Sequence, residues 1–392
     1  MEKDRFELIA PCHFGLEAVL KREIQDLGYE ILKVEDGKVQ YLADAGGIAR
    51  SNMFLRTTER VMIRAAEFTA VTFDELYEKV RAVDWKALIP PDGKVWVTKA
   101  NSVKSKLFSP SDIQSITKKA IVDKLMQQYG LTVVPETGAE FPLRISILKD
   151  VVTIGLDTSG VSLHKRGYRT DSVKAPISET LAAALLMLTP WKKDRILVDP
   201  FCGSGTFLIE AAMMGAKIAP GMNREFLSQE WNHIIPKRAW YDALNEAMEA
   251  VEDQFESDIQ GYDIDFRAVR AAKENAKRAG VEHLIHFQER DVKDLSHRGK
   301  YGFIVTNPPY GERIEEKENL PALYRTLGER FNALDSWSMY LITSFEQAES
   351  CIGRKADKNR KIYNGMLKTY FYSFEGPRPP KRSREDRIKE GD

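Results

Sequence analysis

One stretch near the middle of the chain limits its fold more than any other. The run 195–199 (RILVD) is a short apolar segment ending on a carboxylate, Pro-Phe-Cys-Gly-Ser-Gly-Thr follows it, and 206–216 (TFLIEAAMMGA) then has helical apolar spacing. A buried strand, a glycine turn and a helix in this order are typical of a parallel, doubly wound sheet, which binds ligands at the carboxyl ends of its strands. The loop matches neither a Walker loop nor a dinucleotide-binding turn, which disfavours a phosphate ligand.

The C-terminal half repeats this alternation and predicts an α/β fold with a mostly parallel sheet. Further strands are expected at 257–265, 284–291, 303–309 and 337–343, with helices at 266–280 and 320–334. The segment 361–374 (KIYNGMLKTYFYSF) predicts two antiparallel strands joined by Asn364-Gly365, a strong hairpin signal. The sheet is therefore expected to close with an antiparallel hairpin.

The first 150 residues have no such alternation and predict two small α+β units, one on each side of residue 65. Expected strands are 6–12, 37–44, 94–100 and a pair around Lys149-Asp150, and expected helices are 15–29, 72–85 and 109–130, the last capped at Ser109 or Ser111 and stopped at Gly130. A boundary is expected near 161–176, where the pattern changes. The Pro-rich, charged segment from Pro377 is expected to be disordered.

Composition excludes several classes of protein. The chain has 392 residues, balanced charge with 58 basic and 58 acidic side chains, and three widely spaced cysteines, so we expect neither a disulfide framework nor a metal site. The longest apolar run, 181–188, is far shorter than the roughly 20 residues that span a bilayer. The amino terminus lacks the pattern of a signal peptide. These observations predict a cytoplasmic protein without a membrane partner.

Charge is nevertheless unevenly distributed. Seven lysines lie between residues 93 and 124 against only Asp112 and Asp123, and a second basic cluster spans 354–361. Such a cluster is either a solvated face or a surface for nucleic acid, and the charge pattern alone leaves both readings open.

Carboxylates end two further predicted strands. Asp263 ends GYDID, where a carboxylate can accept both hydroxyls of a ribose, whereas Asp265 is better placed to cap the following helix. Asp291 and Val292 follow the next strand and could meet the amino group and ring of an adenine. Together with Asp199, these positions predict a ligand that carries hydroxyls or positive charge.

The segment Asn307-Pro308-Pro309-Tyr310 follows the strand 303–306 and suits chemistry on a conjugated amine. The Asn307 side-chain oxygen and the Pro308 carbonyl can accept hydrogen bonds from an exocyclic amine, which orients its nitrogen and stabilises the transition state as a bond forms. The Pro-Pro pair stiffens this platform, and Tyr310 offers a face on which a flipped base can stack. A plain proline turn is the weaker interpretation.

These motifs in this order resemble class I S-adenosylmethionine-dependent methyltransferases that methylate amino groups. The resemblance implies S-adenosylmethionine as cofactor and Asn307, Pro308, Pro309 and Tyr310 as the residues at the target amine. It further implies a set of cofactor-binding residues: Glu179, Asp199, Pro200, Phe201, Gly203, Ser204, Gly205, Thr206, Asp263, Ile264, Asp291, Val292 and Asn307.

Segments outside these motifs, among them VSLHKRGYR, APISETLAAALL and RKIYNGMLKTYFY, are similar to the RlmL-type, THUMP-domain-containing RNA guanine-N2 methyltransferases. The resemblance implies a ferredoxin-like domain at 1–65, a THUMP RNA-binding domain at 66–160, a methyltransferase domain at 165–376 and a tail at 377–392. Enterobacterial members carry a second methyltransferase domain, so we expect the stand-alone bacterial form. The expected RNA contacts are Lys94, Lys99, Lys104, Lys106, Lys118, Lys119, Lys165, Arg166 and Arg169.

The expected function is methyl transfer to the exocyclic N2 of a guanine in ribosomal RNA, 23S first, as naked RNA or in a pre-ribosomal particle. Transfer RNA is the main alternative, because THUMP domains also accompany enzymes that act on it. The same Asn-Pro-Pro-Tyr motif serves DNA adenine-N6 and release-factor glutamine methylation, which the THUMP-like region disfavours. An RNA-binding assembly protein without catalysis is the last alternative.

Overall fold

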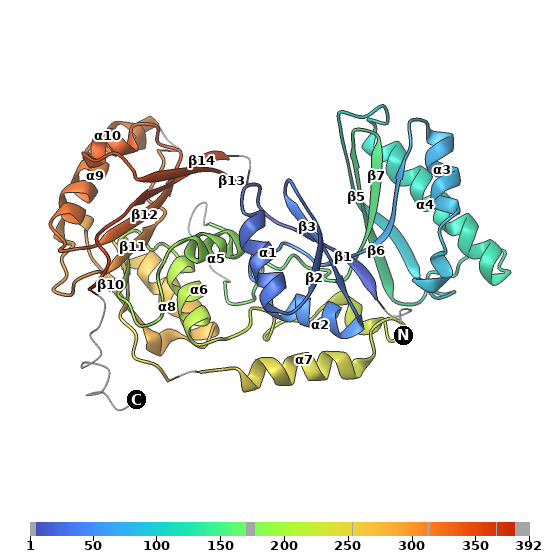
Figure 1. Cartoon of the computed structure of the whole chain (residues 1–392), viewed down its shortest axis with the longest axis horizontal. Helices are drawn as coiled ribbons and strands as arrows, with labels where there is room; N and C mark the ends of the chain where they lie inside the picture. The colour runs from blue at the N-terminus through green and yellow to red at the C-terminus, as the bar shows by residue number, and fades with distance from the viewer. Residues whose placement is uncertain (1–4, 170–176, 253, 312–313, 366, 381–392) are drawn as a thin grey trace. The chain divides into compact units, whose positions relative to one another are not determined.

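The structure is a computed structural model that describes residues 5–169, 177–252, 254–311, 314–365 and 367–380. The chain divides into two compact units (Figure 1). Unit 1 comprises Met1–Arg166 and Ala219–Val251, and unit 2 comprises Gly167–Ile218 and Glu252–Asp392. The chain therefore leaves unit 2 for residues 219–251, which fold with unit 1, and then returns.

Unit 1 is built on one sheet with strand order β2-β3-β1-β4-β7-β6-β5, in which β5 and β6 are parallel and the other neighbours antiparallel. The strands are β1 (Phe6–Pro11), β2 (Glu30–Glu35), β3 (Lys38–Ala43), β4 (Met62–Thr69), β5 (Lys94–Val103), β6 (Glu140–Leu148) and β7 (Val151–Asp157). The helices are α1 (Glu17–Asp26), α2 (Ala45–Phe54), α3 (Phe73–Arg81), η1 (Trp85–Ala87), α4 (Pro110–Tyr129), η2 (Leu227–Glu230) and α7 (Lys237–Glu249).

Side-chain alternation gives the β5–β7 part of this sheet two different faces. Phe141, Leu143, Ile145 and Ile147 alternate along β6 and are all buried in the core of unit 1. Figure 1 shows α3 and α4 beside this part of the sheet, and α4 ends at Gly130 in the left-handed conformation that the sequence predicts. The intervening β6 residues therefore lie on the opposite face.

The α+β units predicted before and after residue 65 contribute to one continuous sheet, because β4 joins them. This strand pairs with β1 through Leu8 and Ile9 and with β7 along its whole length, so both regions share one sheet. The eight residues of β4 pair with one neighbouring strand along each edge. Sequence periodicity can predict a strand, but it does not show which strands pair. The sequence also failed to predict β2, α2 and α7.

The segment 219–251 packs on unit 1 through an amphipathic helix. Trp240, Ala243 and Ala247 form the buried side of α7. Arg50 on α2 donates two hydrogen bonds of 2.7 Å to the Glu246 carboxylate on α7, a bidentate ion pair. These contacts explain why residues lying between two elements of unit 2 fold with unit 1.

Unit 2 contains the predicted α/β sheet, with strand order β10-β9-β8-β11-β12-β14-β13. The pairs from β10 to β12 are parallel, and β14 pairs antiparallel with β12 and β13. The strands are β8 (Leu197–Asp199), β9 (Ile259–Asp263), β10 (Ile285–Glu289), β11 (Phe303–Thr306), β12 (Ser338–Thr343), β13 (Lys358–Asn364) and β14 (Leu367–Phe374). The helices are α5 (Glu179–Leu188), α6 (Thr206–Gly215), α8 (Phe266–Arg278), η3 (Glu282–Leu284), η4 (Val292–Asp294), α9 (Ile314–Asn332) and α10 (Ala348–Ile352).

This topology confirms the predicted fold class. The chain order reverses between β8 and β11, and such a switch point is where open α/β sheets bind ligands. In the closing hairpin Asn364 pairs with Leu367, and Gly365 has a positive φ of 61°, as the Asn-Gly signal predicts. The tail expected to be disordered lies outside the described residues from position 381 onward.

Candidate functional site

Asp199 lies at the carboxyl end of β8, directly at the switch point. Its side chain is 2% exposed, and its Oδ1 atom accepts hydrogen bonds from the Thr306 hydroxyl at 2.6 Å and from the Phe201 N–H at 3.1 Å. Thr306 ends β11, which pairs in parallel with β8. The register of these two strands thus fixes the carboxylate, and Thr306 is a site residue that sequence reasoning missed.

Burial makes the charged form of Asp199 costly. It raises the pKa of Asp199 to about 7, the bonds from Thr306 and Phe201 lower the pKa only partly, and the nearby Asp263 raises it further. A cation bound beside Asp199 would favour the ionised carboxylate. This site therefore suits a ligand with positive charge.

The loop after β8 depends on two glycines with positive φ. Gly203 and Gly205 have φ of 50° and 83°, and a Cβ on Gly205 would lie 3.1 Å from the Ala272 Cβ. The Asn275 side chain donates a hydrogen bond of 3.1 Å to the Ser204 carbonyl, another contact the sequence did not indicate. The loop is consequently held against α8.

Asp263 connects this loop to the end of β9. Its Oδ2 accepts from the Gly203 N–H at 3.0 Å and its Oδ1 from the Asp265 N–H at 2.9 Å, while burial raises the pKa of Asp263. A carboxylate has about four acceptor positions, so backbone N–H groups do not use all of those on Asp263. Ile264 and Phe266 beside it are 70% and 55% exposed, so the Asp263 carboxylate adjoins exposed apolar side chains.

Asp265 and Asp291 each cap the amino terminus of a helical segment, α8 and η4 respectively. Asp265 caps α8 by accepting from the Arg267 N–H at 2.9 Å, as predicted. Asp291 accepts from the Lys293 N–H at 3.0 Å and pairs with its ammonium group at 3.2 Å, which together lower the pKa of Asp291. Val292 follows β10 and is buried in the core of unit 2, so its side chain packs against other core residues.

Asn307, Pro308, Pro309 and Tyr310 follow β11 as a hydrogen-bonded platform. The Tyr310 hydroxyl donates to the Asn307 side-chain oxygen, which has a second lone pair available. The Pro309 carbonyl accepts from the buried Tyr324 hydroxyl at 3.2 Å, and that hydroxyl also bonds Thr343 at 2.6 Å. Tyr324, which sequence reasoning missed, thereby ties the platform to α9 and β12.

Three expected site residues make contacts within the protein. Glu179 begins α5, is buried, and pairs with Arg169 at 2.5 Å, while Arg169 also donates to the Ile177 carbonyl. Arg166 is 3% exposed and donates to the Leu163 and Arg56 carbonyls. Of the expected 165–169 basic cluster, only Lys165 is classed as exposed.

The lysines expected to contact RNA lie on β5, the following loop and α4. Some form ion pairs, Lys94 with Glu140 at 2.8 Å, Lys118 with Glu136 at 3.0 Å and Lys119 with Asp123 at 2.9 Å. Lys99, Lys104 and Lys106 are exposed on β5 and the loop after it. The net positive charge of this face therefore concentrates at the end of β5.

Family comparisons match three parts of the chain. Residues 166–372 match the RMKL-like methyltransferase domain, 7–62 the RlmL ferredoxin-like domain and 70–157 the THUMP domain. A Bacillus subtilis protein named "Putative RNA methyltransferase YpsC" is 48% identical over 97% of this chain and 99% of its own length. The chain belongs to the RMKL-like methyltransferase family. The resemblance in the motifs is thus confirmed.

Two further relatives of this methyltransferase are informative. A "Ribosomal RNA large subunit methyltransferase K/L" from Methylococcus capsulatus is 34% identical over 94% of this chain, which spans 51% of that protein. The crystal structure of a "putative methyltransferase complexed with SAH" is 42% identical, has a TM-score of 0.91 and covers 96% of this chain and 100% of its own. S-adenosylhomocysteine is what remains of S-adenosylmethionine after methyl transfer, so the expected cofactor is confirmed.

The residues of this methyltransferase fit that cofactor. S-adenosylmethionine supplies an activated methyl group and carries sulfonium and ammonium cations, a ribose diol and an adenine. The buried Asp199 carboxylate suits a cation, the Asp263 oxygens suit a diol, and exposed Ile264 and Phe266 suit an apolar ring. Over the described residues, no group of three or more His, Cys, Asp or Glu is placed to hold a metal ion, and no helix is long and apolar enough to cross a membrane.

Proposed function

We propose that the chain transfers a methyl group from S-adenosylmethionine to the exocyclic N2 of a guanine in ribosomal RNA. The observation that carries this proposal is the Asn307–Tyr310 platform. It places an amide acceptor and an aromatic ring directly after β11, the strand whose Thr306 hydroxyl donates a hydrogen bond to Asp199. The THUMP domain and the ribosomal RNA methyltransferase among the relatives support RNA as the substrate class.

The platform suits an amine whose lone pair is delocalised into a ring. The free lone pair of the Asn307 oxygen accepts one amine N–H, and the Pro308 carbonyl accepts the other, so the nitrogen lone pair points at the methyl group. The amine nitrogen would form the N–C bond with its lone pair as the methyl–sulfur bond breaks, the electron pair of that bond would stay on sulfur to leave the neutral thioether, and the cationic nitrogen would release its extra proton to water. Tyr310 supplies a stacking face for the flipped guanine.

A covalent enzyme intermediate has no support at this site. Cys202 is the cysteine of the glycine loop, it is buried, and burial together with Asp199 and Asp263 raises the pKa of its thiol. A thiol held in its protonated form is a poor nucleophile. Direct transfer to the amine therefore remains the proposed route, and Cys202→Ser is expected to keep the chemistry.

We assign Asp263 to the ribose of the cofactor and predict that Asp263→Ala weakens its binding by about tenfold to a hundredfold, because hydrogen bonds to a charged acceptor are lost. Isothermal titration with S-adenosylmethionine measures the effect. Asp265→Asn is the matched control, since asparagine still caps α8 and the dissociation constant should stay at the wild-type value. An unchanged constant in Asp263→Ala would contradict the assignment.

The experiment that tests the function uses labelled S-adenosylmethionine with unmodified ribosomal RNA and, separately, unmodified transfer RNA and duplex DNA. The product is digested and the labelled nucleoside identified. N2-methylguanosine from ribosomal RNA alone is the expected result. Label in transfer RNA would overturn the substrate, label on adenine in DNA would overturn the base, and cofactor binding without label in naked RNA or ribosomal particles would overturn catalysis.

A further inference from the structure

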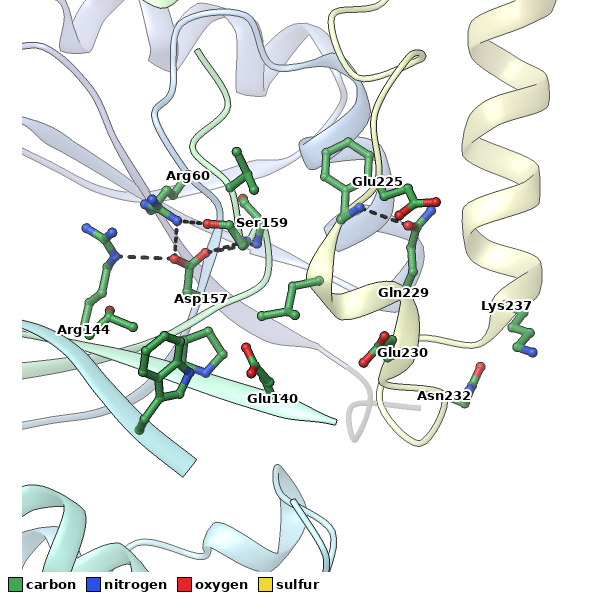
Figure 2. A pocket seen from close by; sticks show the side chains of 17 residues that line it. Arg60, Glu140, Arg144, Asp157, Ser159, Glu225, Gln229, Glu230, Asn232 and Lys237 are labelled. Carbon is green, nitrogen blue, oxygen red and sulfur yellow. Dashed lines mark hydrogen bonds and ion pairs between the residues drawn. The ribbon is translucent and has the colours of Figure 1, made fainter. Parts of the chain in front are cut away.

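A cavity of about 850 Å³ lies wholly within unit 1 (Figure 2). Its volume is within the range of small-ligand sites, and the catalytic loops, which belong to unit 2, contribute nothing to it. Side chains from the sheet of unit 1 and from residues 225–237 line it.

The cavity is formed by the sheet face that alternates with the core side of β6. Glu140, Pro142 and Arg144 alternate with Phe141 and Leu143 and line the cavity from this face. Trp96 on β5 lies in register with Pro142. The segment that leaves unit 2, residues 225–237, contributes the other wall, as Figure 2 shows. The cavity therefore exists only because this segment folds onto unit 1.

One end of the cavity has more guanidinium groups than carboxylates. Asp157 is buried and pairs with Arg60 at 2.5 Å and with Arg144 at 3.4 Å. The contact of Arg144 is an ion pair through its buried Nε atom, which makes no hydrogen bond within the described part of the chain. The pKa of Arg144 is lowered by burial and by the repulsion of Arg60, and only partly restored by Asp157. This end is built to accept an anion.

Arg224 does not line the cavity but adds positive charge near Arg60. The pKa of Arg224 is lowered to about 10, first by burial and then by the charges of Arg166 and Arg60. Arg224 donates to the carbonyls of Val161, Ser162 and Lys165, so it is fixed in place. Arg60 and Arg144 thus share the Asp157 carboxylate, while Arg224 adds a third guanidinium group whose own hydrogen bonds go to carbonyls.

The opposite wall carries acceptors instead. Glu225, Gln229, Glu230 and Asn232 line it, and Figure 2 shows them across the cavity from Arg60 and Arg144. The Gln229 oxygen accepts from the Phe226 N–H at 3.0 Å, which fixes η2. Exposed carboxylates here would repel a simple anion that filled the cavity. The walls together suit a ligand with an anion at one end and N–H donors at the other.

An exposed aromatic ring also lines the cavity. Trp96 is 44% exposed, which is unusual for so large an apolar side chain, and it lies on β5, the edge strand of the sheet. A solvent-accessible indole is a stacking platform for a base, and each such contact contributes substantially to single-strand binding.

We propose that this cavity binds one unpaired nucleotide of the RNA substrate, with the phosphate at Arg60 and Arg144, the base on Trp96, and the base amino and imino groups at the Glu225–Asn232 wall. This inference rests on the proposed function, because it takes the polymer to be RNA. A free nucleoside monophosphate shares the same chemistry, so the experiment includes both sources.

The experiment measures binding of a fluorescent ribosomal RNA fragment and of free guanosine, adenosine and cytidine monophosphates to the full chain. Trp96→Ala is expected to weaken RNA binding by about tenfold, and Arg144→Gln by about tenfold with a salt dependence reduced by about one ion. Trp96→Phe and Arg144→Lys should recover most of the affinity. Tyr241→Ala is the matched control, because Tyr241 is 66% exposed on α7 and outside the cavity.

The outcomes separate this inference from the proposed function. Loss in the Trp96 and Arg144 variants, with Tyr241→Ala at the wild-type affinity and thermal unfolding unchanged, supports the nucleotide site. Wild-type affinity in both variants, or an equal loss in Tyr241→Ala, overturns it while RNA methylation still stands. If only the free monophosphates bind and depend on Trp96, RNA is overturned as the source. If RNA is bound through Trp96 but never methylated, the proposed function fails and the site remains.

Discussion

Replacing Asn307 by alanine is expected to lower the rate of methyl transfer by about a hundredfold to a thousandfold, the usual cost of removing one preorganised polar group at a reacting centre. The variant loses the oxygen that accepts both the Tyr310 hydroxyl and, in our proposal, the target amine. Cofactor affinity is expected to survive, because the carboxylates proposed to hold it are untouched. Single-turnover transfer and cofactor titration measure the two effects separately.

Two variants of Tyr310 distinguish the hydroxyl from the ring. Tyr310→Phe removes the hydrogen bond to Asn307 but keeps the stacking face, so only a few-fold loss is expected. Tyr310→Ala removes both and should lower the rate by about tenfold to a hundredfold. Full activity in Asn307→Ala would refute the amine-binding role of the platform, and equal effects of the two Tyr310 variants would remove the stacking role.

Asp199→Asn is expected to stabilise the fold at neutral pH while it weakens cofactor binding. The folded-state pKa of Asp199 is about 7 and its ordinary value is 3.8, so the folded state binds more protons between these values and stability falls as pH rises from 4 to 7. Asparagine keeps an acceptor for Thr306 and Phe201 and removes this cost. The gain in the free energy of unfolding of Asp199→Asn over the wild type should be absent near pH 4 and reach at most about 4 kcal/mol above pH 7.

Denaturant unfolding of both proteins between pH 4 and 8 measures this gain, and isothermal titration measures the expected loss in cofactor affinity of about tenfold or more, because an ionised partner of a cationic ligand is gone. Asp265→Asn is again the control, since its carboxylate is exposed and caps α8. A stability difference that does not depend on pH would contradict the raised pKa. A residue that binds a ligand but lowers the stability of the fold is common at functional sites.

The strand-end motifs made much of the fold and site predictable. Carboxyl ends of parallel strands meet at one sheet edge, so Asp199, Asp263 and Asn307 could be grouped from their positions after apolar runs. The hairpin at Asn364-Gly365 and the end of α4 at Gly130 were predicted because their residues favour positive φ. The roles assigned to the individual site residues stay predictions.

Other features depend on contacts that spacing does not encode. Thr306 reaches Asp199 only because of the register between β8 and β11, and Tyr324 reaches Pro309 from a helix. Charge pattern placed Arg166 and Arg169 with the RNA contacts, but their guanidinium groups bond to carbonyls and to Glu179. The sequence shows that an arginine is charged. Whether its guanidinium group bonds within the protein or stays available for RNA depends on the fold.

Because residues 219–251 fold with unit 1, neither unit is one continuous stretch of chain. The backbone passes between the units at 166–167, 218–219 and 251–252, so a fragment that begins at Gly167 carries an orphaned segment with it. That segment would expose Trp231, Ile234, Ile235 and Trp240, all of which are buried in the core of unit 1. During synthesis, unit 1 must wait for residue 251 before its core is complete. A recombination event or a domain dissection drawn at a single breakpoint would therefore yield two aggregating halves.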